Sequence, residues 1–197
     1  MAAPSRADAT RARLFEAAVA AFAEKGFHGT TTRDIAAAAG MSPAAMYVHH
    51  RSKEELLHLI SREGHQAALD VVRTARAGTD DLVAQLTDVA RAFALFHVHH
   101  HTVARVLNYE LAALSEEHRA EIDELRTGID RELRALVGEG VAAGVFDVPD
   151  PALAATALAS MGIDIARWYR EDGEWTPTQI GDYYADLALR LAGATSA

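Results

Sequence analysis

The sequence predicts an all-α protein, in which an N-terminal three-helix domain with a helix-turn-helix precedes a larger helical domain, with about nine helices in all. Apolar residues recur at intervals of three and four along most of the chain, which is the spacing of one helix face. No stretch alternates polar and apolar residues convincingly, and no hairpin signal is present. Serine, threonine or aspartate precedes many of the periodic segments, as expected for helix N-caps.

Composition limits the class of protein. Half of the 197 residues are hydrophobic, which is enough for a substantial core in one large domain or two smaller ones. The chain has no cysteine, so disulfides, thiolate metal sites and cysteine nucleophiles are excluded. No apolar run reaches the ~20 residues of a membrane-spanning helix, and the N-terminus lacks the pattern of a signal peptide. We therefore expect a cytoplasmic protein with no membrane partner.

Cap residues divide the beginning of the chain into short helices. A first helix is predicted from Asp8 to Lys25, where Gly26 can take the left-handed conformation of a C-terminal cap. Thr31 lies three residues before Asp34, which is the spacing of a capping box. Gly40 then ends this second helix after about two turns.

A third short helix follows at once. Ser42-Pro43 begins it, with serine as the N-cap and proline at the first helical position. Two short helices joined by a tight glycine-containing turn form a helix-turn-helix, whose second helix enters the major groove of DNA. That helix would run from Ser42 to about His49, where small side chains can approach bases and polar ones can reach phosphates. The candidate DNA-binding residues are Thr31, Thr32, Arg33, Ser42, Pro43, Ala44, Ala45, Tyr47, His49 and Lys53.

The net charge of −9 is unevenly distributed along the chain. The first 60 residues carry seven lysines and arginines against six acidic residues, whereas the remainder carries twelve against twenty-two. The acidity therefore lies outside the candidate DNA-binding part. Because that part is only weakly basic, we expect DNA binding that needs two copies of the domain and is sensitive to salt.

The same stretch resembles a known family. It reads Gly-Phe-x-x-Thr-Thr-x-x-Asp-Ile-Ala from Gly26, then Ala-Gly-Met-Ser from Ala39, then Tyr-x-x-His-x-Ser-Lys-Glu-Glu-Leu from Tyr47. This order is similar to the DNA-binding domain of the TetR family of repressors. One position departs from the pattern, because that family usually has phenylalanine where this chain has His50. The phenylalanine helps to anchor the recognition helix, so the resemblance places the tilt of that helix in question.

Periodic apolar positions predict the remaining helices. The expected ranges are Lys53–Arg76, Asp80–His99, Val103–Leu114, Ser115–Ala143, Pro151–Arg170 and a last helix that begins at Thr176-Pro177. We assign residues 1–52 to a DNA-binding domain and residues 53–197 to an effector-binding and dimerisation domain. The last two helices are amphipathic and could pair with those of a second copy in a four-helix interface, or simply complete the core of the monomer. The need for two DNA half-sites, together with the family resemblance, favours the homodimer.

Large apolar residues in the second domain predict a ligand pocket between helices. The candidate lining residues are Phe93, Phe96, Leu107, Glu110, Leu111, Ile129, Leu133, Met161, Ile165 and Trp168. In TetR-like repressors such a pocket binds a small molecule that releases the protein from a palindromic operator, and the resemblance implies the same here. The run from Ala166 to Tyr184 is also similar to family members that control lipid and steroid breakdown and respond to acyl-CoA thioesters. The resemblance therefore implies a hydrophobic effector, with an acyl-CoA thioester and an aromatic or drug-like compound as candidates, and no cofactor is expected.

A histidine cluster supports an alternative function. His97 and His101 are four residues apart and can share one helical face, a spacing that zinc uses. A metal-dependent helical enzyme or a metal sensor is therefore the alternative to a regulator, and a polar helix junction is the structural explanation of the same residues. A helical module that only dimerises is a third possibility. No catalytic triad, phosphate-binding loop or metalloprotease motif is visible, which favours a protein that is not an enzyme.

Overall fold

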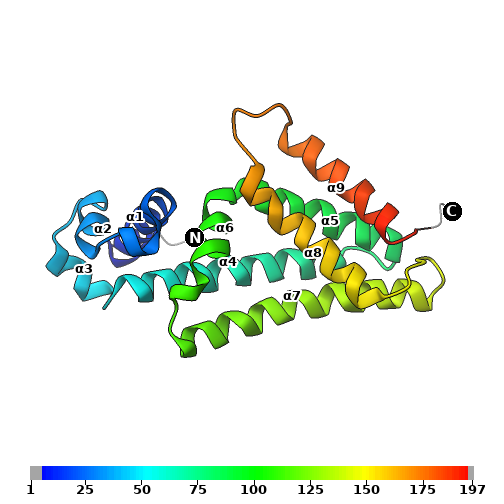
Figure 1. Ribbon diagram of the computed structural model, residues 1–197, viewed down its shortest axis with the longest axis horizontal. Coiled ribbons are helices and arrows are strands. Elements are labelled where there is room, and N and C mark those ends of the chain that lie inside the picture. The colour runs from blue at the N-terminus through cyan, green and yellow to red at the C-terminus, as the bar shows by residue number, and fades with distance from the viewer. Residues whose placement is uncertain (1–5, 195–197) are drawn as a thin grey trace. The chain divides into compact units, whose positions relative to one another are not determined.

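The computed structural model describes the backbone of residues 6–194 and the side chains of residues 8–194. Over this range the chain forms nine α-helices, one turn of 3-10 helix and no strand, so the predicted all-α class and number of helices are confirmed (Figure 1). The helices belong to two compact units. The first unit holds the residues up to 64 together with 102–122, and the second holds 65–101 together with the residues from 123 onward.

The first unit contains the predicted helix-turn-helix. Its elements are α1 (Arg6–Gly29), α2 (Thr32–Ala38), α3 (Pro43–His49), the beginning of α4 (Lys53–Arg76), α6 (His101–Glu110), the 3-10 turn η1 (Leu111–Ala113) and the beginning of α7 (Glu116–Ala142). Regular helix breaks at the predicted position within α1, because Gly26 has φ +70° and ψ 166°. The core of this unit is formed by large apolar side chains, among them Leu14, Phe22, Phe27, Ile35, Met46 and Leu56.

The second unit is a bundle in which α5 is central. Besides the later parts of α4 and α7, it contains α5 (Leu82–His99), α8 (Pro151–Trp168) and α9 (Pro177–Leu191). Helix α5 packs along α9 and also against α8 (Figure 1). Each of these three helices begins with a side-chain cap, from Asp81, Asp150 and Thr176 respectively. The Asp81 cap sets the start of α5 at Leu82, two residues later than predicted, whereas α8 and α9 begin at Pro151 and Pro177 as predicted.

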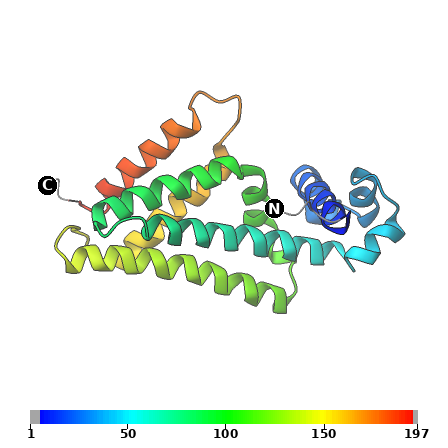
Figure 2. The same ribbon diagram turned by 180° about the vertical axis from the view of Figure 1, so that it is seen from behind.

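Charged side chains join α4 to α7 within the second unit, where the two helices run alongside one another (Figure 2). The guanidinium of Arg76 donates to the carboxylates of Glu132 and Glu139, and Arg73 donates to Glu132. Hydrogen bonding to Glu139 is the largest cause that raises the pKa of Arg76. This network fixes the register of the two helices, and their apolar residues pack in the core beside it.

No helix in residues 6–194 is both long enough and apolar enough to cross a membrane.

Candidate functional site

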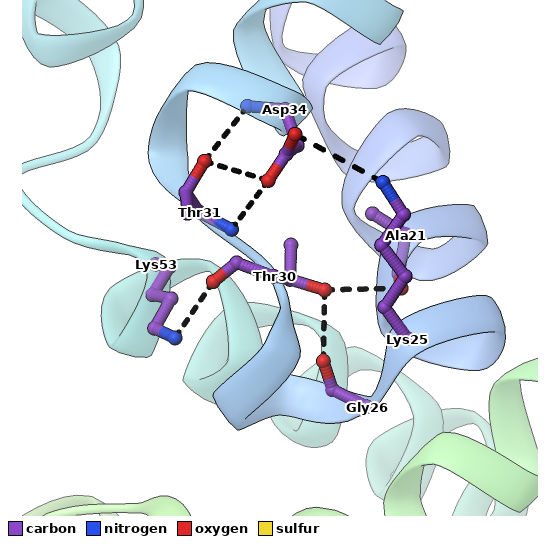
Figure 3. Close-up of polar contacts among 7 residues, drawn as sticks. All are labelled: Ala21, Lys25, Gly26, Thr30, Thr31, Asp34 and Lys53. Carbon is purple, nitrogen blue, oxygen red and sulfur yellow. Dashed lines mark hydrogen bonds and ion pairs between the residues drawn. The ribbon is translucent and has the colours of Figure 1, made fainter.

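A capping box fixes the start of α2, as the sequence predicts (Figure 3). The Thr31 hydroxyl oxygen accepts a hydrogen bond from the Asp34 backbone N–H at 3.2 Å, and the Asp34 carboxylate accepts from the Thr31 backbone N–H at 2.8 Å. The Thr31 hydroxyl also donates to that carboxylate, and this bond is the largest cause that lowers the pKa of Asp34. Such caps stabilise a helix start by about 1 kcal/mol, which is substantial for a seven-residue helix.

The segment between α1 and α2 is held by Thr30 and Lys53 (Figure 3). Thr30 is buried, and its hydroxyl lies 3.0 Å from the carbonyl oxygen of Ala21 and 2.8 Å from that of Gly26. The Lys53 ammonium donates to the carbonyl oxygens of Phe27 at 2.6 Å and Thr30 at 2.8 Å. It also lies 4.3 Å from the centre of the Phe27 ring, a cation–π distance. The Lys53 ammonium is therefore engaged inside the unit, where it ties the start of α4 to the end of α1.

The turn between α2 and α3 is closed by backbone bonds. Gly40 has φ +68°, and its N–H donates to the Ala37 carbonyl, while the Met41 N–H donates to the Ala36 carbonyl. These two bonds form the Schellman arrangement that typically ends a helix. Ser42 then accepts a hydrogen bond from the Ala45 N–H at 3.2 Å and caps α3, with proline at its first position, as predicted.

Helix α3 is anchored by one buried side chain and presents its other side to solvent. Met46 is fully buried, whereas Tyr47 is 51 % exposed and Val48 is 81 % exposed. The hydroxyls of Tyr47 and Thr32 lie 3.2 Å apart, so a hydrogen bond joins α3 to the start of α2. The exposed surface of α3 and the capped start of α2 therefore form one continuous surface, which we call the α2–α3 face.

The structure brings most of the predicted DNA-binding residues onto this face. Seven are exposed, namely Thr31, Arg33, Ser42, Pro43, Ala44, Ala45 and Tyr47. Thr32 and His49 are half-buried at its border. Lys53 is half-buried and bound to carbonyl oxygens rather than offered to solvent. Val48 was not among the predicted residues, although it follows Ala44 by four positions, a helical spacing that could have revealed it.

His50, the residue that departs from the family pattern, ends α3. Its N–H donates to the Met46 carbonyl, and its ring is only 6 % exposed. Within the described residues the ring atom Nε2 is buried without a hydrogen-bond partner. Burial is the main cause that lowers the pKa of His50, opposed by Glu55 and assisted by His49 and Arg11. The folded unit therefore holds His50 preferentially in its neutral form.

A small apolar cavity lies among the helices of the second unit. It is lined by Leu86, Val89, Ala90, Phe93, Leu133, Leu158, Met161, Gly162, Tyr184 and Ala188. Its volume is about 20 Å³, which is close to the space of one water molecule. Gly162 makes the close packing possible, because a Cβ there would lie 2.5 Å from the Phe93 ring. A ligand larger than a water molecule would therefore need side chains to move.

Of the predicted pocket residues, Phe93, Leu133 and Met161 line this cavity. Phe96 and Ile129 belong to the surrounding apolar cluster, while Ile165 and Trp168 belong to a second cluster with Val98 and Tyr169. Leu107, Glu110 and Leu111 lie in the first unit. The sequence thus identified apolar helix faces correctly but could not distinguish the cavity wall from the neighbouring core.

The rings of His97 and His101 bond to backbone carbonyls of the preceding helical turn. His97 is buried with Nδ1 2.9 Å from the Phe93 carbonyl oxygen, and because a carbonyl only accepts, Nδ1 carries the proton. Burial lowers the pKa of His97 to about 4. His101 Nδ1 lies 3.0 Å from the Val98 carbonyl oxygen. Among the residues whose side chains are described, no three histidine, aspartate or glutamate groups lie together as a metal site requires.

Comparison with known proteins identifies the family. Residues 14–60 match the model of the bacterial regulatory proteins of the tetR family, and residues 79–192 match that of the tetracyclin repressor-like C-terminal domain. The chain belongs to the TetR family. The first match covers α2, the turn and α3, so these elements are the helix-turn-helix of a DNA-binding transcriptional regulator.

Individual TetR-family proteins resemble the chain over nearly its whole length. The HTH-type transcriptional repressor KstR2 of Mycobacterium tuberculosis is 30% identical over 187 residues, which is 94% of this chain and 92% of KstR2. The crystal structure of a tetR-family regulatory protein from Rhodococcus RHA1 has 37% identity and a TM-score of 0.90, covering 98% of this chain and 100% of that one. The structure of AibR in complex with isovaleryl coenzyme A and operator DNA has 25% identity and a TM-score of 0.83, covering 94% of this chain and 100% of AibR.

The substitution His50→Phe should stabilise the first unit by about 1 kcal/mol, because it removes a buried nitrogen that lacks a partner. The gain should grow on acidification. Burial lowers the pKa of His50 in the folded state below the unfolded value of about 6.5. Above that pH the ring is neutral in both states, and protonation costs the folded state no stability. As the pH falls below that value, the unfolded chain takes up the proton first and the wild type loses stability. Denaturant unfolding of both proteins at about pH 7.5 and about pH 5.5 measures the difference.

The comparison with the wild type cancels the contributions of the other histidines, including His97. The matched control is His49→Gln, which removes the neighbouring half-buried imidazole and reports the effect of losing a less buried ring from α3. An advantage of His50→Phe that stays the same at both pH values would contradict this account. A loss of stability at both would mean that the larger ring does not fit.

Proposed function

We propose that the chain is a homodimeric repressor that binds a palindromic operator and is released by a small hydrophobic effector, with an acyl-CoA thioester as the candidate. Residues 1–52 would form the DNA-binding domain, and residues 53–197 would bind the effector and form the dimer. Helices α4 and α7 each supply residues to both compact units, so they are covalent links through which one unit can act on the other.

The observation that carries the DNA-binding part of the proposal is the α2–α3 face. Helix α3 is fixed by Met46, by its Ser42 cap and by the bond between Tyr47 and Thr32. Its exposed surface fulfils no packing role within the unit, as expected of a helix that inserts into a major groove. The hydroxyls of Thr31 and Tyr47 and the guanidinium of Arg33 border this surface, where phosphates of the groove edge would lie.

Tyr47→Phe should weaken binding to all duplex DNA by about fivefold, because it removes one hydroxyl from the proposed phosphate contacts. Its thermal stability should fall only slightly, because the bond to Thr32 that it loses lies at the exposed surface and Met46 still anchors α3. Lys53→Ala should lower both affinity and stability, because its ammonium binds two backbone carbonyls. Affinity is measured by titration of labelled operator DNA, selected by the protein from a random duplex library, at about 50 and about 200 mM salt.

Specific, salt-sensitive binding by the wild type is the result that supports the proposed function. If the wild type selects no sequence from the library, the protein is not an operator-binding regulator of the proposed kind. If it selects a sequence but Tyr47→Phe binds as tightly as the wild type, the Tyr47 hydroxyl does not contact a phosphate.

The exposed sides of α8 and α9 support a homodimer. Leu153, Thr156, Ser160 and Ile163 lie on α8 at alternating intervals of three and four, and all are exposed in the single chain. This is the spacing of a helix–helix contact surface. On α9, Tyr183 is 65 % exposed although Ile180 of the same helix is buried. Such residues are typical of an interface between copies of α8 and α9.

Tyr183→Glu should therefore convert the protein to a monomer and reduce operator affinity by more than about tenfold, because it places a charge in a desolvated interface. Sedimentation velocity measures the association state. Tyr109→Glu is the matched control, since Tyr109 is an equally exposed tyrosine outside α8 and α9. A Tyr183→Glu protein that remains dimeric would place the interface elsewhere.

The effector proposal combines the apolar cavity with two relatives. AibR binds isovaleryl coenzyme A according to its structure, and KstR2 is described as a ketosteroid transcriptional regulator. In this chain the cavity wall is apolar apart from the Tyr184 hydroxyl, so it suits the hydrophobic part of such a molecule. Arg126, Arg134 and Arg167, three candidates for the phosphates of coenzyme A, each pair with an aspartate of their own helix. The structure therefore supports binding of the acyl part of the ligand more directly than binding of the coenzyme A phosphates.

Acyl-CoA thioesters should raise the melting temperature and release the operator, whereas coenzyme A alone should not. Met161→Phe should retain operator binding but lose the response, because its slightly larger side chain fills the small cavity. Met161→Leu, which nearly conserves volume, should respond like the wild type. The measurement is a thermal-shift and operator-release series with isovaleryl-CoA, longer acyl-CoA thioesters and the free acids. Release by aromatic compounds but by no thioester would contradict the acyl-CoA candidate and leave the operator-binding function intact.

A further inference from the structure

The outermost edge of α3 carries only apolar side chains. An α-helix turns by about 100° per residue, so Ala44 and Val48, two residues either side of Met46, both point within about 20° of the direction opposite it. Met46 is fully buried, which fixes the inward direction of the helix. Ala44 and Val48 are both exposed, the latter by 81 %. These two side chains are therefore the ones that lie deepest in any groove that accepts α3.

Polar groups of α3 lie to the sides of this edge, and the hydroxyls of Tyr47 and Ser42 have partners within the unit. The Tyr47 hydroxyl is bonded to that of Thr32 at the start of α2. The Ser42 hydroxyl oxygen caps the helix by accepting from Ala45. His49 lies on the inward side and is half-buried. The leading edge therefore offers no side-chain donor or acceptor to a base, and the direct reading of bases by hydrogen bonds is not available to Ala44 or Val48.

The remaining base feature that an apolar side chain can recognise in the major groove is the C5-methyl group of thymine. We propose that α3 selects its operator through thymine methyl groups, with Val48 as the main specificity-determining residue and Ala44 as the second. This inference rests on the proposed operator-binding function. The exposed apolar side chains of α3 would contact the methyl group of a T·A base pair, because they belong to the α2–α3 face that is proposed to enter the major groove.

Readout of a methyl group responds to a base change to which hydrogen-bond readout is insensitive. Deoxyuridine differs from thymidine only by the missing methyl group, and it keeps every donor and acceptor of the base pair. Burying one additional carbon is worth about fourfold in affinity, so replacing a contacted thymine by deoxyuridine should weaken binding about fourfold. A T·A to C·G change should weaken binding further, and 5-methylcytosine at the same position should restore part of the loss.

The test uses the full-length protein and the operator selected from the random library. Each thymine of one half-site is replaced in turn by deoxyuridine, and the dissociation constant is measured for the wild type and for Val48→Ala. We expect one or two thymines per half-site to respond in the wild type. At the thymine that contacts Val48, the response should disappear in Val48→Ala, because that variant has already lost the contact.

Two controls separate a lost contact from other effects. Deoxyuridine in the flanking DNA should have no effect, and Val48→Ala should keep the melting temperature and the affinity for unrelated DNA, since Val48 is almost fully exposed. Val48→Thr is the matched variant, because threonine keeps the branched shape but replaces one methyl by a hydroxyl. It should show an intermediate response to deoxyuridine.

The outcomes distinguish this inference from the function on which it rests. Failure to select any sequence overturns the proposed function. Selection of a sequence in which no deoxyuridine changes the affinity overturns the methyl readout alone. Sensitivity to deoxyuridine that is equal in the wild type and in Val48→Ala would keep the methyl readout but remove it from Val48.

Discussion

The contact of Lys53 with the end of α1 is the constraint on which the DNA-binding part depends. The last carbonyls of a helix lack partners within the helix and carry partial negative charge, so a cation is favoured there. The Lys53 ammonium binds the carbonyl oxygens of Phe27 and Thr30 and lies over the Phe27 ring. It thereby joins the end of α1, the start of α2 and the start of α4 at one point. The orientation of α2 at this point also determines the orientation of α3, because the hydrogen-bonded turn at Gly40 joins the two helices.

The same unit contains one interaction that is incomplete. His50 fills a buried position with a ring, as the phenylalanine of the family pattern would, but leaves Nε2 without a partner in the described residues. Its backbone N–H still closes α3 on the Met46 carbonyl. The helix is thus anchored by shape and backbone bonding, while the polar atom makes the site less stable and sensitive to pH. Histidine in place of phenylalanine at position 50 therefore affects the stability of α3 more than its position. Met46 and the bond of Tyr47 to Thr32 also hold the helix in place.

The sequence predicted those features whose partners are near in the chain. The capping box of Thr31 and Asp34 and the Ser42 cap each join residues three positions apart, and the break at Gly26 depends on a single glycine, so a local pattern reveals them. From the sequence, Lys53 was expected to contact phosphate. Its ammonium instead binds two carbonyl oxygens that lie 23 and 26 residues earlier in the chain, and no local pattern reveals partners at that separation. The cavity wall likewise joins α5, α7, α8 and α9, and apolar periodicity shows which face of each helix is buried but not which residues meet.

The small size of the cavity bears on how an effector would act. An apolar space of about 20 Å³ cannot hold an acyl chain, so such a ligand must bind a form in which residues such as Phe93 or Met161 have moved. A ligand shifts an equilibrium only by its difference in affinity for the two forms, and a closed form without room for an acyl chain would bind it weakly. If the closed form is the one that binds the operator, effector and operator exclude one another by linkage. Tight packing around Gly162, where even a Cβ would meet the Phe93 ring, then keeps the operator-binding form dominant until the effector is abundant.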